Sequence, residues 1–149
     1  MKHLSYLLLI IGGAGLLTGC ATGPTFNQVE ASIPALAPNN GRIYFYRTAV
    51  VGAAVQPAVK LNGEVVGTAK PGGFFYVDRL PGDYKVETST EVKRELSLTL
   101  DKGQSRYVRL DISMGFFVGH VYPILVEDAI GKSEIANCSY TGFKLENGK

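Results

Sequence analysis

Chemistry is most clearly indicated at Cys20, a thiol that directly follows the tripeptide Leu17-Thr18-Gly19. Lys2 places a positive charge near the first residue, and residues 4–17 form an apolar stretch that leads up to the thiol. A stretch of this length fits the hydrophobic region of an export signal, and it is shorter than the roughly 20 residues that a membrane-spanning helix requires. Residues 1–19 are therefore predicted to be an export signal that ends immediately before Cys20.

The sequence Leu17-Thr18-Gly19-Cys20 resembles the lipobox of bacterial lipoproteins. That resemblance implies transfer of a diacylglyceryl group to the Cys20 sulfur, cleavage before Cys20, and often acylation of the new amino group. Because a single acyl chain, at about 0.8 kcal/mol per buried methylene, gives only marginal binding, durable attachment requires several chains. The lipid bilayer, reached through acylated Cys20, is thus the first expected partner. The alternative is a plain secretory signal with an incidental cysteine.

Ala21 bears on which membrane is reached. In Gram-negative bacteria an aspartate at this position resembles a signal for retention in the inner membrane. Ala21 resembles the default case, which implies the cell outer membrane with the domain on its periplasmic face. Cleavage also removes Lys2, one of 15 basic residues, and leaves a near balance against 13 acidic residues. This balance argues against a polyanion-binding protein, so no nucleic acid partner is expected.

Soft metal ligands are scarce once residues 1–19 are removed, because His120 and Cys138 alone remain beside Cys20. Zinc sites use three or four such ligands, so neither a metal nor another cofactor is expected. His120 is expected to be a strand or loop histidine with a satisfied hydrogen bond. If Cys20 carries lipid, Cys138 has no partner for an intrachain disulfide. It is then either a buried small hydrophobe or a site of accidental dimerisation.

Motifs for covalent catalysis are not found in the sequence. No serine stands in a G-x-S-x-G context, and the glycine-rich residues 12–15 lie within the export signal. The carboxylates do not follow the spacing of a calcium loop. The protein is therefore expected not to be an enzyme, with an envelope enzyme that uses carboxylate or lysine chemistry left as an alternative.

Tyrosine and arginine side chains on the predicted strands form a candidate binding face, called the Tyr/Arg face below. These residue types are enriched where proteins meet partners, so the face is expected to contact an envelope protein or a glycan. A routinely solvated strand face is the alternative. The members are Tyr44, Tyr46, Arg47, Arg79, Tyr107 and Arg109.

Short β-strands are predicted to position these side chains. Asn62-Gly63, between the apolar runs 59–61 and 64–66, is a strong signal for a β-hairpin. Residues 96–100 and 107–112 alternate between apolar and polar, which places one face of each strand on a core and the other in water. Turn signals recur about every 9–12 residues, which favours a mostly β, antiparallel β-sandwich.

Further strands are predicted at residues 43–46, 74–80 and 84–87, and the C-terminal part is less regular. Residues 116–126 fit one bent strand or two, and residues 140–145 fit a final edge strand. Residues 127–136 fit a short C-terminal helix, although Gly131 weakens it by about 1 kcal/mol. The doublets Gly73-Phe74-Phe75 and Gly115-Phe116-Phe117 are interpreted as starts of core strands, with an exposed aromatic patch as the alternative.

Residues 20–41 are expected to connect the lipid to the domain as a tether. They contain three prolines and a single charged residue, Glu30. A flexible coil of this length would place its ends about 25 Å apart, and full extension would reach about 70 Å. Part of the segment is also expected to pack along the domain, because it contains four sizeable apolar residues: Phe26, Val29, Ile33 and Leu36.

The predicted domain, residues 42–145, carries a family resemblance, and residues 146–149 are expected to be frayed. The octapeptide Leu80-Pro81-Gly82-Asp83-Tyr84-Lys85-Val86-Glu87 resembles the turn and strand of PEGA-type and related transthyretin-like sandwiches. The wider arrangement over residues 40–136 is similar to DUF2846, a family of bacterial lipoproteins of unknown function. Its motifs are Arg42-Ile43-Tyr44-Phe45-Tyr46-Arg47, Leu61-Asn62-Gly63-Glu64, Gly72-Gly73-Phe74-Phe75 and Gly103-x-x-x-Tyr107-Val108-Arg109.

The resemblance implies an immunoglobulin-like or transthyretin-like sandwich and brings no catalytic residues. Together with the anchor, it favours a non-catalytic binding or scaffolding module of the cell envelope. The alternatives are the envelope enzyme named above and a carrier of small apolar ligands with a cavity between its sheets.

Overall fold

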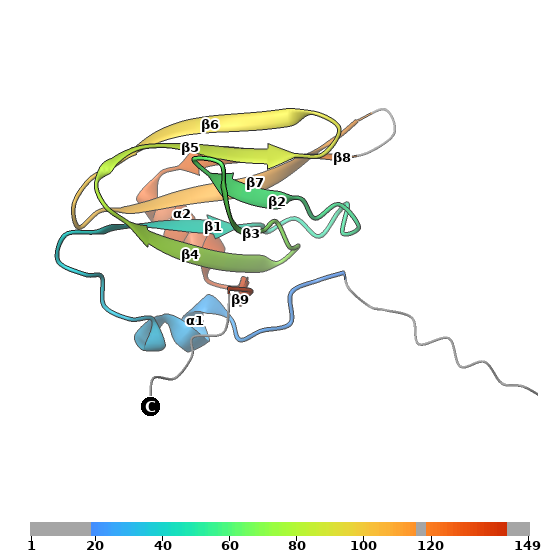
Figure 1. The fold of residues 1–149 in the computed structure, drawn as a ribbon. Coiled ribbons are helices and arrows are strands. Elements are labelled where there is room, and N and C mark those ends of the chain that lie inside the picture. The colour runs from blue at the N-terminus through green and yellow to red at the C-terminus, as the bar shows by residue number, and fades with distance from the viewer. Residues whose placement is uncertain (1–18, 116–118, 143–149) are drawn as a thin grey trace, which may run out of the picture.

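The computed structural model describes residues 19–115 and 119–142, and these residues form two packed β-sheets with two helices (Figure 1). The five-stranded sheet has the order β8-β7-β1-β4-β9 and the four-stranded sheet has the order β3-β2-β5-β6. The first sheet contains β1 (Gly41–Tyr46), β4 (Gly73–Arg79), β7 (Ser105–Met114), β8 (Gly119–Val126) and β9 (Ser139–Tyr140). The second contains β2 (Ala58–Leu61), β3 (Glu64–Thr68), β5 (Gly82–Ser89) and β6 (Lys93–Leu100). The helices are α1 (Phe26–Val29), followed by the 3-10 turn η1 (Glu30–Ser32), and α2 (Asp128–Ile135).

The main core lies between the two sheets, as the predicted mostly β sandwich requires. Alternate residues of the longer strands point into it, so one face of these strands is apolar. The Phe45 and Phe75 rings stack across β1 and β4 at a centroid distance of 5.0 Å. The sandwich with its short C-terminal helix is therefore confirmed. The fully buried side chains of this core include Ile43, Phe45, Val59, Val86, Leu100 and Val108.

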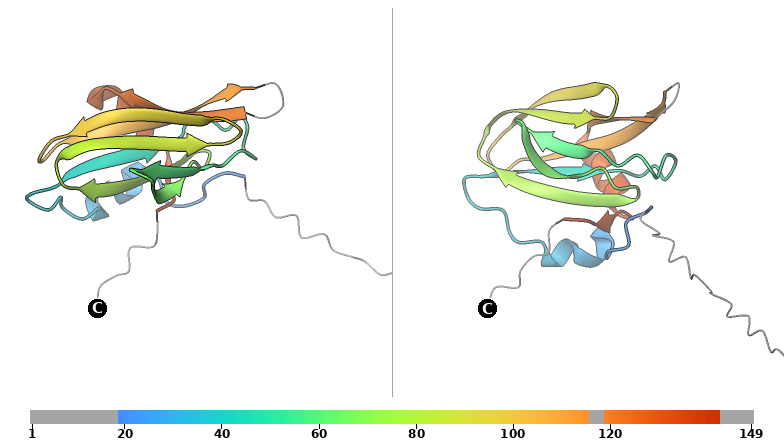
Figure 2. Two further views of the ribbon diagram at one scale, coloured as in Figure 1. Left: turned by 45° about the horizontal axis from the view of Figure 1, so that its top comes forward. Right: turned by 45° about the vertical axis from the view of Figure 1, so that its right-hand side comes forward.

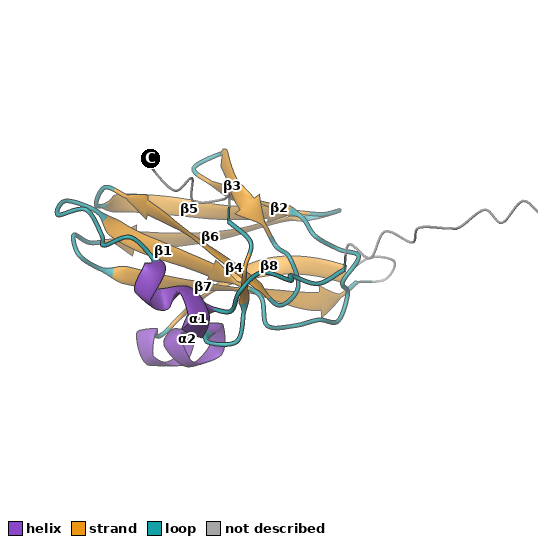
Figure 3. Cartoon of the chain, turned by 90° about the horizontal axis from the view of Figure 1, so that it is seen from below, coloured by secondary structure: helices purple, strands orange, loops and turns teal. Residues whose placement is uncertain are grey.

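A second core lies on the other face of the five-stranded sheet, where α1 and α2 cover the strands (Figures 2 and 3). Phe26 of α1 meets Phe74 of β4 edge-on at 5.4 Å, and Ile135 of α2 is fully buried. The molecule thus has three layers, and the five-stranded sheet is the middle one. This arrangement explains why β1 is buried along its whole length and carries apolar or aromatic side chains on both faces.

Two strand pairs are parallel, whereas the sequence predicted an antiparallel sandwich. β1 pairs with β7 in parallel, and the two-residue β9 pairs with β4 in the same sense. Parallel neighbours require a long crossover connection. The whole four-stranded sheet, together with β4, lies between β1 and β7 in sequence and provides that crossover. Local hairpin signals cannot report such a pairing, because the paired strands are distant in sequence.

The hairpin predicted at Asn62-Gly63 is confirmed. Leu61 pairs with Glu64, and both turn residues have positive φ, at 49° and 85°. The predicted C-terminal helix is α2, and the predicted edge strand is reduced to β9 within the described residues. Phe116, Phe117 and residues 143–149 lie outside the described residues, so the second Phe doublet is not placed.

Residues 21–33 pack along the domain instead of extending from it. The Tyr140 amide donates to the carbonyl oxygen of Pro24 at 2.8 Å, and the Phe26 amide donates to that of Cys138 at 2.9 Å. Gln28 accepts a hydrogen bond from the Thr25 amide at 2.8 Å, which supports the first turn of α1. The reach of a free coil therefore does not apply to these residues. Among the described helices, none is long and apolar enough to cross a membrane.

Candidate functional site

The tyrosines of the Tyr/Arg face are buried, so the predicted exposed binding face is corrected. Tyr44, Tyr46 and Tyr107 all lie in the second core beneath α1 and α2. The Tyr44 and Tyr107 rings stack at 5.1 Å, and Phe26 meets Tyr44 edge-on at 5.8 Å. The predicted strands and their alternation are present, but helices from both ends of the chain cover the side that was assigned to solvent.

Arg109 and Tyr46 meet at the carboxylate of Glu134 on α2. Tyr46 Oη donates to Glu134 Oε2 at 2.6 Å, and Arg109 Nη1 donates to both carboxylate oxygens at 2.8 and 3.0 Å. Arg109 Nε also donates to Asp111 Oδ1 at 2.8 Å. Burial raises the pKa of Glu134, but the hydrogen bonds from Tyr46 and Arg109 outweigh it and leave that pKa below its ordinary value. This network attaches α2 to β1 and β7.

Arg42 holds the N-terminal segment in a similar way, although it was not among the predicted site residues. Its Nε and Nη2 donate to the two carboxylate oxygens of Asp78 at 2.6 and 2.8 Å, and Nη2 also donates to the Pro34 carbonyl at 2.9 Å. Its guanidinium lies 4.5 Å from the centre of the Tyr76 ring. Its alternation with Tyr44 along β1 is the sequence signal that places it on this face.

Arg47 lies at the end of β1 and is fully buried, but it does not join the tyrosines. Its guanidinium donates four hydrogen bonds, of 2.7–3.1 Å, to backbone carbonyls of Val51, Gly52, Val55 and Ala69. Nε has no hydrogen-bond partner among the described residues. Burial lowers the pKa of Arg47, and the nearby Cys20 thiol opposes that shift. Arg47 therefore fixes the loop between β1 and β2 and lies close to Cys20.

Arg79 is the sixth member of the Tyr/Arg face and lies apart from the others. It is partly exposed at the end of β4, where its Nη2 lies 3.4 Å from Glu64 Oε2. The six predicted residues therefore occupy three places: the second core, the β1–β2 loop and the far end of β4. They do not form one site.

Cys20 is exposed, and the residues on both sides of it are bound to the domain. The Gln56 side-chain amide donates to the Gly19 carbonyl at 2.8 Å, and the Ala21 amide donates to the Pro71 carbonyl at 2.9 Å. The same end of the sandwich contains the β1–β2, β3–β4 and β5–β6 loops, the end of β7 at Met114 and the start of β8 at Gly119, at the right in Figure 1. We call this region the Cys20 end.

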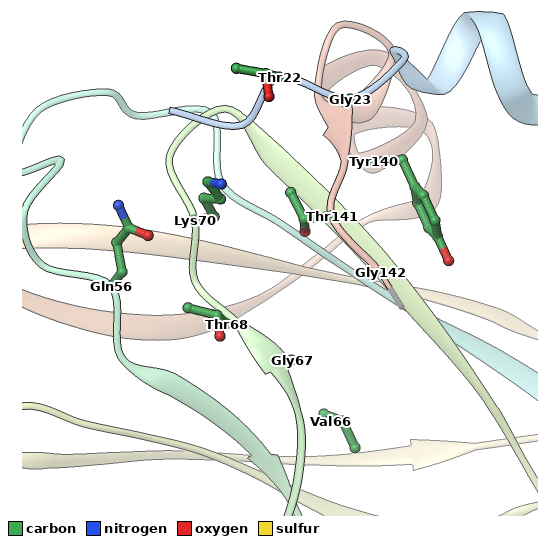
Figure 4. A pocket seen from close by; sticks show the side chains of 10 residues that line it. All are labelled: Thr22, Gly23, Gln56, Val66, Gly67, Thr68, Lys70, Tyr140, Thr141 and Gly142. Carbon is green, nitrogen blue, oxygen red and sulfur yellow. The ribbon is translucent and has the colours of Figure 1, made fainter. Parts of the chain in front are cut away.

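A pocket of about 450 Å³ opens beside the Cys20 end (Figure 4). Residues 22–23, the end of β3, and the loop before β4 surround it, together with residues 140–142. Its polar groups are threonine hydroxyls, the Gln56 amide and the Lys70 ammonium, which together can hydrogen-bond an anionic or carbonyl-bearing group. This pocket could not be predicted from the sequence, because its lining comes from segments that are distant along the chain.

His120 and Cys138 have separate local roles. His120 Nδ1 lies 3.0 Å from Thr90 Oγ1, which links β8 to the β5–β6 turn. Cys138 is buried in the second core, and burial raises its pKa to about 11. Within the described residues, no group of three or more His, Cys, Asp or Glu side chains is arranged to hold a metal ion.

The sequence of the domain matches a known family. The profile described as "Protein of unknown function (DUF2846)" matches residues 37–121, which is more than half of the chain. The protein belongs to the DUF2846 family. The predicted resemblance to DUF2846 is thereby confirmed. The DUF2846 match runs from just before β1 into β8, so Cys20, α1 and α2 lie outside it.

One relative shares more than the DUF2846 match. It is described as an uncharacterized protein of Haemophilus influenzae (strain ATCC 51907 / DSM 11121 / KW20 / Rd). It is 28% identical over 141 residues, which cover 91% of this chain and 84% of the relative. The similarity therefore extends beyond the residues of the family profile.

Proposed function

We propose that this DUF2846 protein is a lipoprotein, anchored in the cell outer membrane through acylated Cys20 with its domain on the periplasmic face. The observation that carries the proposal is Leu17-Thr18-Gly19-Cys20 directly behind the apolar residues 4–17. The exposure of Cys20 supports it, because a sulfur that carries acyl chains must lie outside the packed core. The anchor would keep the domain at the membrane permanently, since several acyl chains bind far more firmly than one.

The domain itself is proposed to be a non-catalytic binding or scaffolding module. The roles of its buried and partly buried charged groups support this function. Arg42 with Asp78 holds the N-terminal segment, Arg109 with Glu134 holds α2, and Arg47 holds a loop. These groups therefore serve packing between segments.

A partner is proposed to contact the outer face of the four-stranded sheet, because helices cover the outer face of the other sheet. This surface is polar and alternates in charge: Lys85 lies 3.8 Å from Glu95, and Lys93 lies 2.6 Å from Glu95. Such exposed pairs contribute little to stability, typically about 0–1 kcal/mol, so they are free to exchange partners. An envelope protein or a glycan fits this polar surface. Its other exposed side chains include Lys60, Ser97 and Thr99.

Mass spectrometry of the mature protein tests the anchor. We expect a chain that begins at Cys20 and carries a diacylglyceryl mass, and we expect Cys20→Ala to leave the membrane fraction. Cys138→Ala is the matched control, because it removes the other cysteine and should leave fractionation unchanged. Ala21→Asp should move the protein from the outer to the inner membrane. An unmodified Cys20, or membrane retention of Cys20→Ala, would refute the anchor.

Crosslinking in whole cells tests whether a partner binds the outer face of the four-stranded sheet. A photo-crosslinking residue at Ser97, on the uncovered sheet, should capture an envelope protein or glycan, and Lys85→Glu should reduce that capture. The same crosslinker at Ser133, exposed on α2, is the control and should not capture it. Equal capture at both positions, or capture that is insensitive to Lys85→Glu, would remove this face from consideration.

A further inference from the structure

Exposed apolar side chains gather at the Cys20 end. Val50 and Val51 lie in the β1–β2 loop, Val92 lies in the β5–β6 turn, and Met114 is the last residue of β7. Val50 is 59%, Val51 62% and Met114 80% exposed. Large apolar residues this exposed at one end of a domain mark a surface that is covered in the cell.

The charges of the two ends differ. Residues 48–57 of the β1–β2 loop contain no ionisable residue, and Arg47 beside them is buried. Lys70 and Glu91 are the ionisable residues of the other described loops at this end, outside the strands. The opposite end carries exposed charged side chains in its turns, namely Asp101, Lys102, Glu127 and Asp128. Exposed Lys93 and Arg94 follow Val92 at the start of β6, so it is the β1–β2 loop itself that is free of charge and has a low desolvation cost against lipid.

The apolar loop has a fixed shape. The Arg47 guanidinium binds four of the carbonyls around it, and Gly52 fits against Ile112 so closely that a Cβ would overlap that side chain. Cleavage before Cys20 removes Gly19, but the hydrogen bond from the Ala21 amide to the Pro71 carbonyl, at 2.9 Å, remains and holds the residue after Cys20 on the domain. Acyl chains on Cys20 would therefore hold this particular end close to the bilayer, with no spacer of free coil.

We propose that the Cys20 end is a lipid-docking surface, with Val50, Val51 and Met114 inserted among the lipid headgroups of the membrane that holds Cys20. This inference rests on the proposed lipid attachment. The occupant is the bilayer surface rather than a protein, because the attachment point lies at the same end of the sandwich as these apolar side chains. The uncovered sheet and the charged end are then left to face the periplasm.

Depth-dependent quenching tests this orientation. Val51→Cys and Leu80→Cys are prepared in the full lipidated chain, labelled with bimane, and reconstituted into phosphatidylethanolamine and phosphatidylglycerol vesicles with or without brominated lipid. Leu80 is the matched control, because it is 64% exposed and lies at the opposite end. Cys20 is blocked by lipid and Cys138 is buried, so labelling is confined to the new thiol. We expect brominated lipid to quench and vesicles to blue-shift the probe at position 51, and neither change at position 80.

Other results would refute either the lipid anchor or the orientation of the domain, and the two can be distinguished. A mass that shows Cys20 unmodified refutes the proposed function and, with it, this inference. A lipidated protein whose probe at position 51 is unquenched, or is quenched equally with position 80, refutes the orientation alone. A blue shift at position 51 without quenching assigns the surface to a protein, such as a second copy of this chain, and also refutes lipid docking. Met114→Cys, at 80% exposed, provides an independent second comparison with Leu80→Cys.

Discussion

Arg47 is a buried guanidinium whose hydrogen bonds in the described structure all go to backbone carbonyls. Carbonyl dipoles replace the carboxylate that a buried cation normally requires. The planar fork of arginine suits this role, because its donors diverge toward several acceptors at once. The residue thereby closes the β1–β2 loop at the end where Cys20 lies.

Arg47→Lys is expected to destabilise the protein by about 3 kcal/mol, because a single ammonium cannot reach all four carbonyls and leaves buried acceptors unpaired. Arg79→Lys is the matched control, since Arg79 is partly exposed and its pair with Glu64 is long. It should cost less than about 0.5 kcal/mol. Urea unfolding followed by circular dichroism measures both, as the chain has no tryptophan. Equal losses in the two variants would contradict a special role for Arg47.

Glu134 gives the stability a pH dependence. Its pKa lies below the ordinary value of 4.5 in the folded protein, although burial acts in the opposite direction, because Tyr46 and Arg109 bind the charged form. Stability from this group is therefore present above pH about 4.5 and is lost as pH falls through the folded pKa. Glu134→Gln should cost about 1 kcal/mol at neutral pH, and that cost should shrink as the pH falls below about 4.5. Unfolding curves of both proteins across that range test the sign, and a cost that persists in acid would contradict it.

The two covering helices depend on close contact with β1, β4 and β7. Gly131 lies in the middle of α2, and a Cβ there would overlap the Tyr107 side chain. In the sequence this glycine weakens the helix, since a helical glycine costs about 1 kcal/mol relative to alanine. In the structure the same glycine allows the helix axis to approach β7. Gly131 therefore lowers the intrinsic helix propensity of α2 but lets α2 pack closely against β7.

The Gly131→Ala variant distinguishes helix propensity from close packing, because the two predict opposite changes in the free energy of unfolding. Helix propensity alone predicts a gain of about 1 kcal/mol, whereas overlap with Tyr107 predicts a net loss of about 1–2 kcal/mol. We expect the loss. Ser133→Ala, at an exposed position of the same helix, should instead gain about 0.5 kcal/mol. Thermal unfolding of the two variants distinguishes them, and stabilisation by Gly131→Ala would show that α2 does not press on Tyr107.

The elements themselves were largely predictable from sequence, and their partners were not. Alternation and turn residues gave the strands, the Asn62-Gly63 hairpin and the short helix. The same signals could not show what covers a strand, because tyrosine suits both a wet surface and a core. Tyr44 and Tyr46 were therefore assigned to a binding face, although Ile43 and Phe45 on the other side already required a core. A strand with large side chains on both faces is better interpreted as the middle layer of three.

At the scale of the whole molecule, the sandwich has a charged end and an apolar end. The apolar end could not be recognised in the sequence, because Val50, Val92 and Met114 come from two loops and a strand end that the topology alone brings to one end of the sandwich. The conformation of the segment that follows Cys20 could not be predicted from the sequence either. Its prolines and single charge indicated a spacer, whereas backbone hydrogen bonds from Ala21 to Pro71 and from Tyr140 to Pro24 hold its first residues on the domain. The proposed anchor and the apolar end are thus joined directly.

Inserting ten Gly and Ser residues between Ala21 and Thr22 should uncouple the domain from its anchor. The insert adds a coil with a root-mean-square length of about 17 Å, so the domain could turn and leave the lipid surface while Cys20 stayed acylated. We expect bromolipid quenching of bimane at position 51 to fall toward the level at position 80, with lipidation unchanged by mass. The same insert between Lys102 and Gly103, in the turn at the charged end, should leave quenching intact. If quenching at position 51 survives the first insert undiminished, the exposed valines and methionine hold the domain on the bilayer by themselves, and the short connection contributes nothing to its orientation.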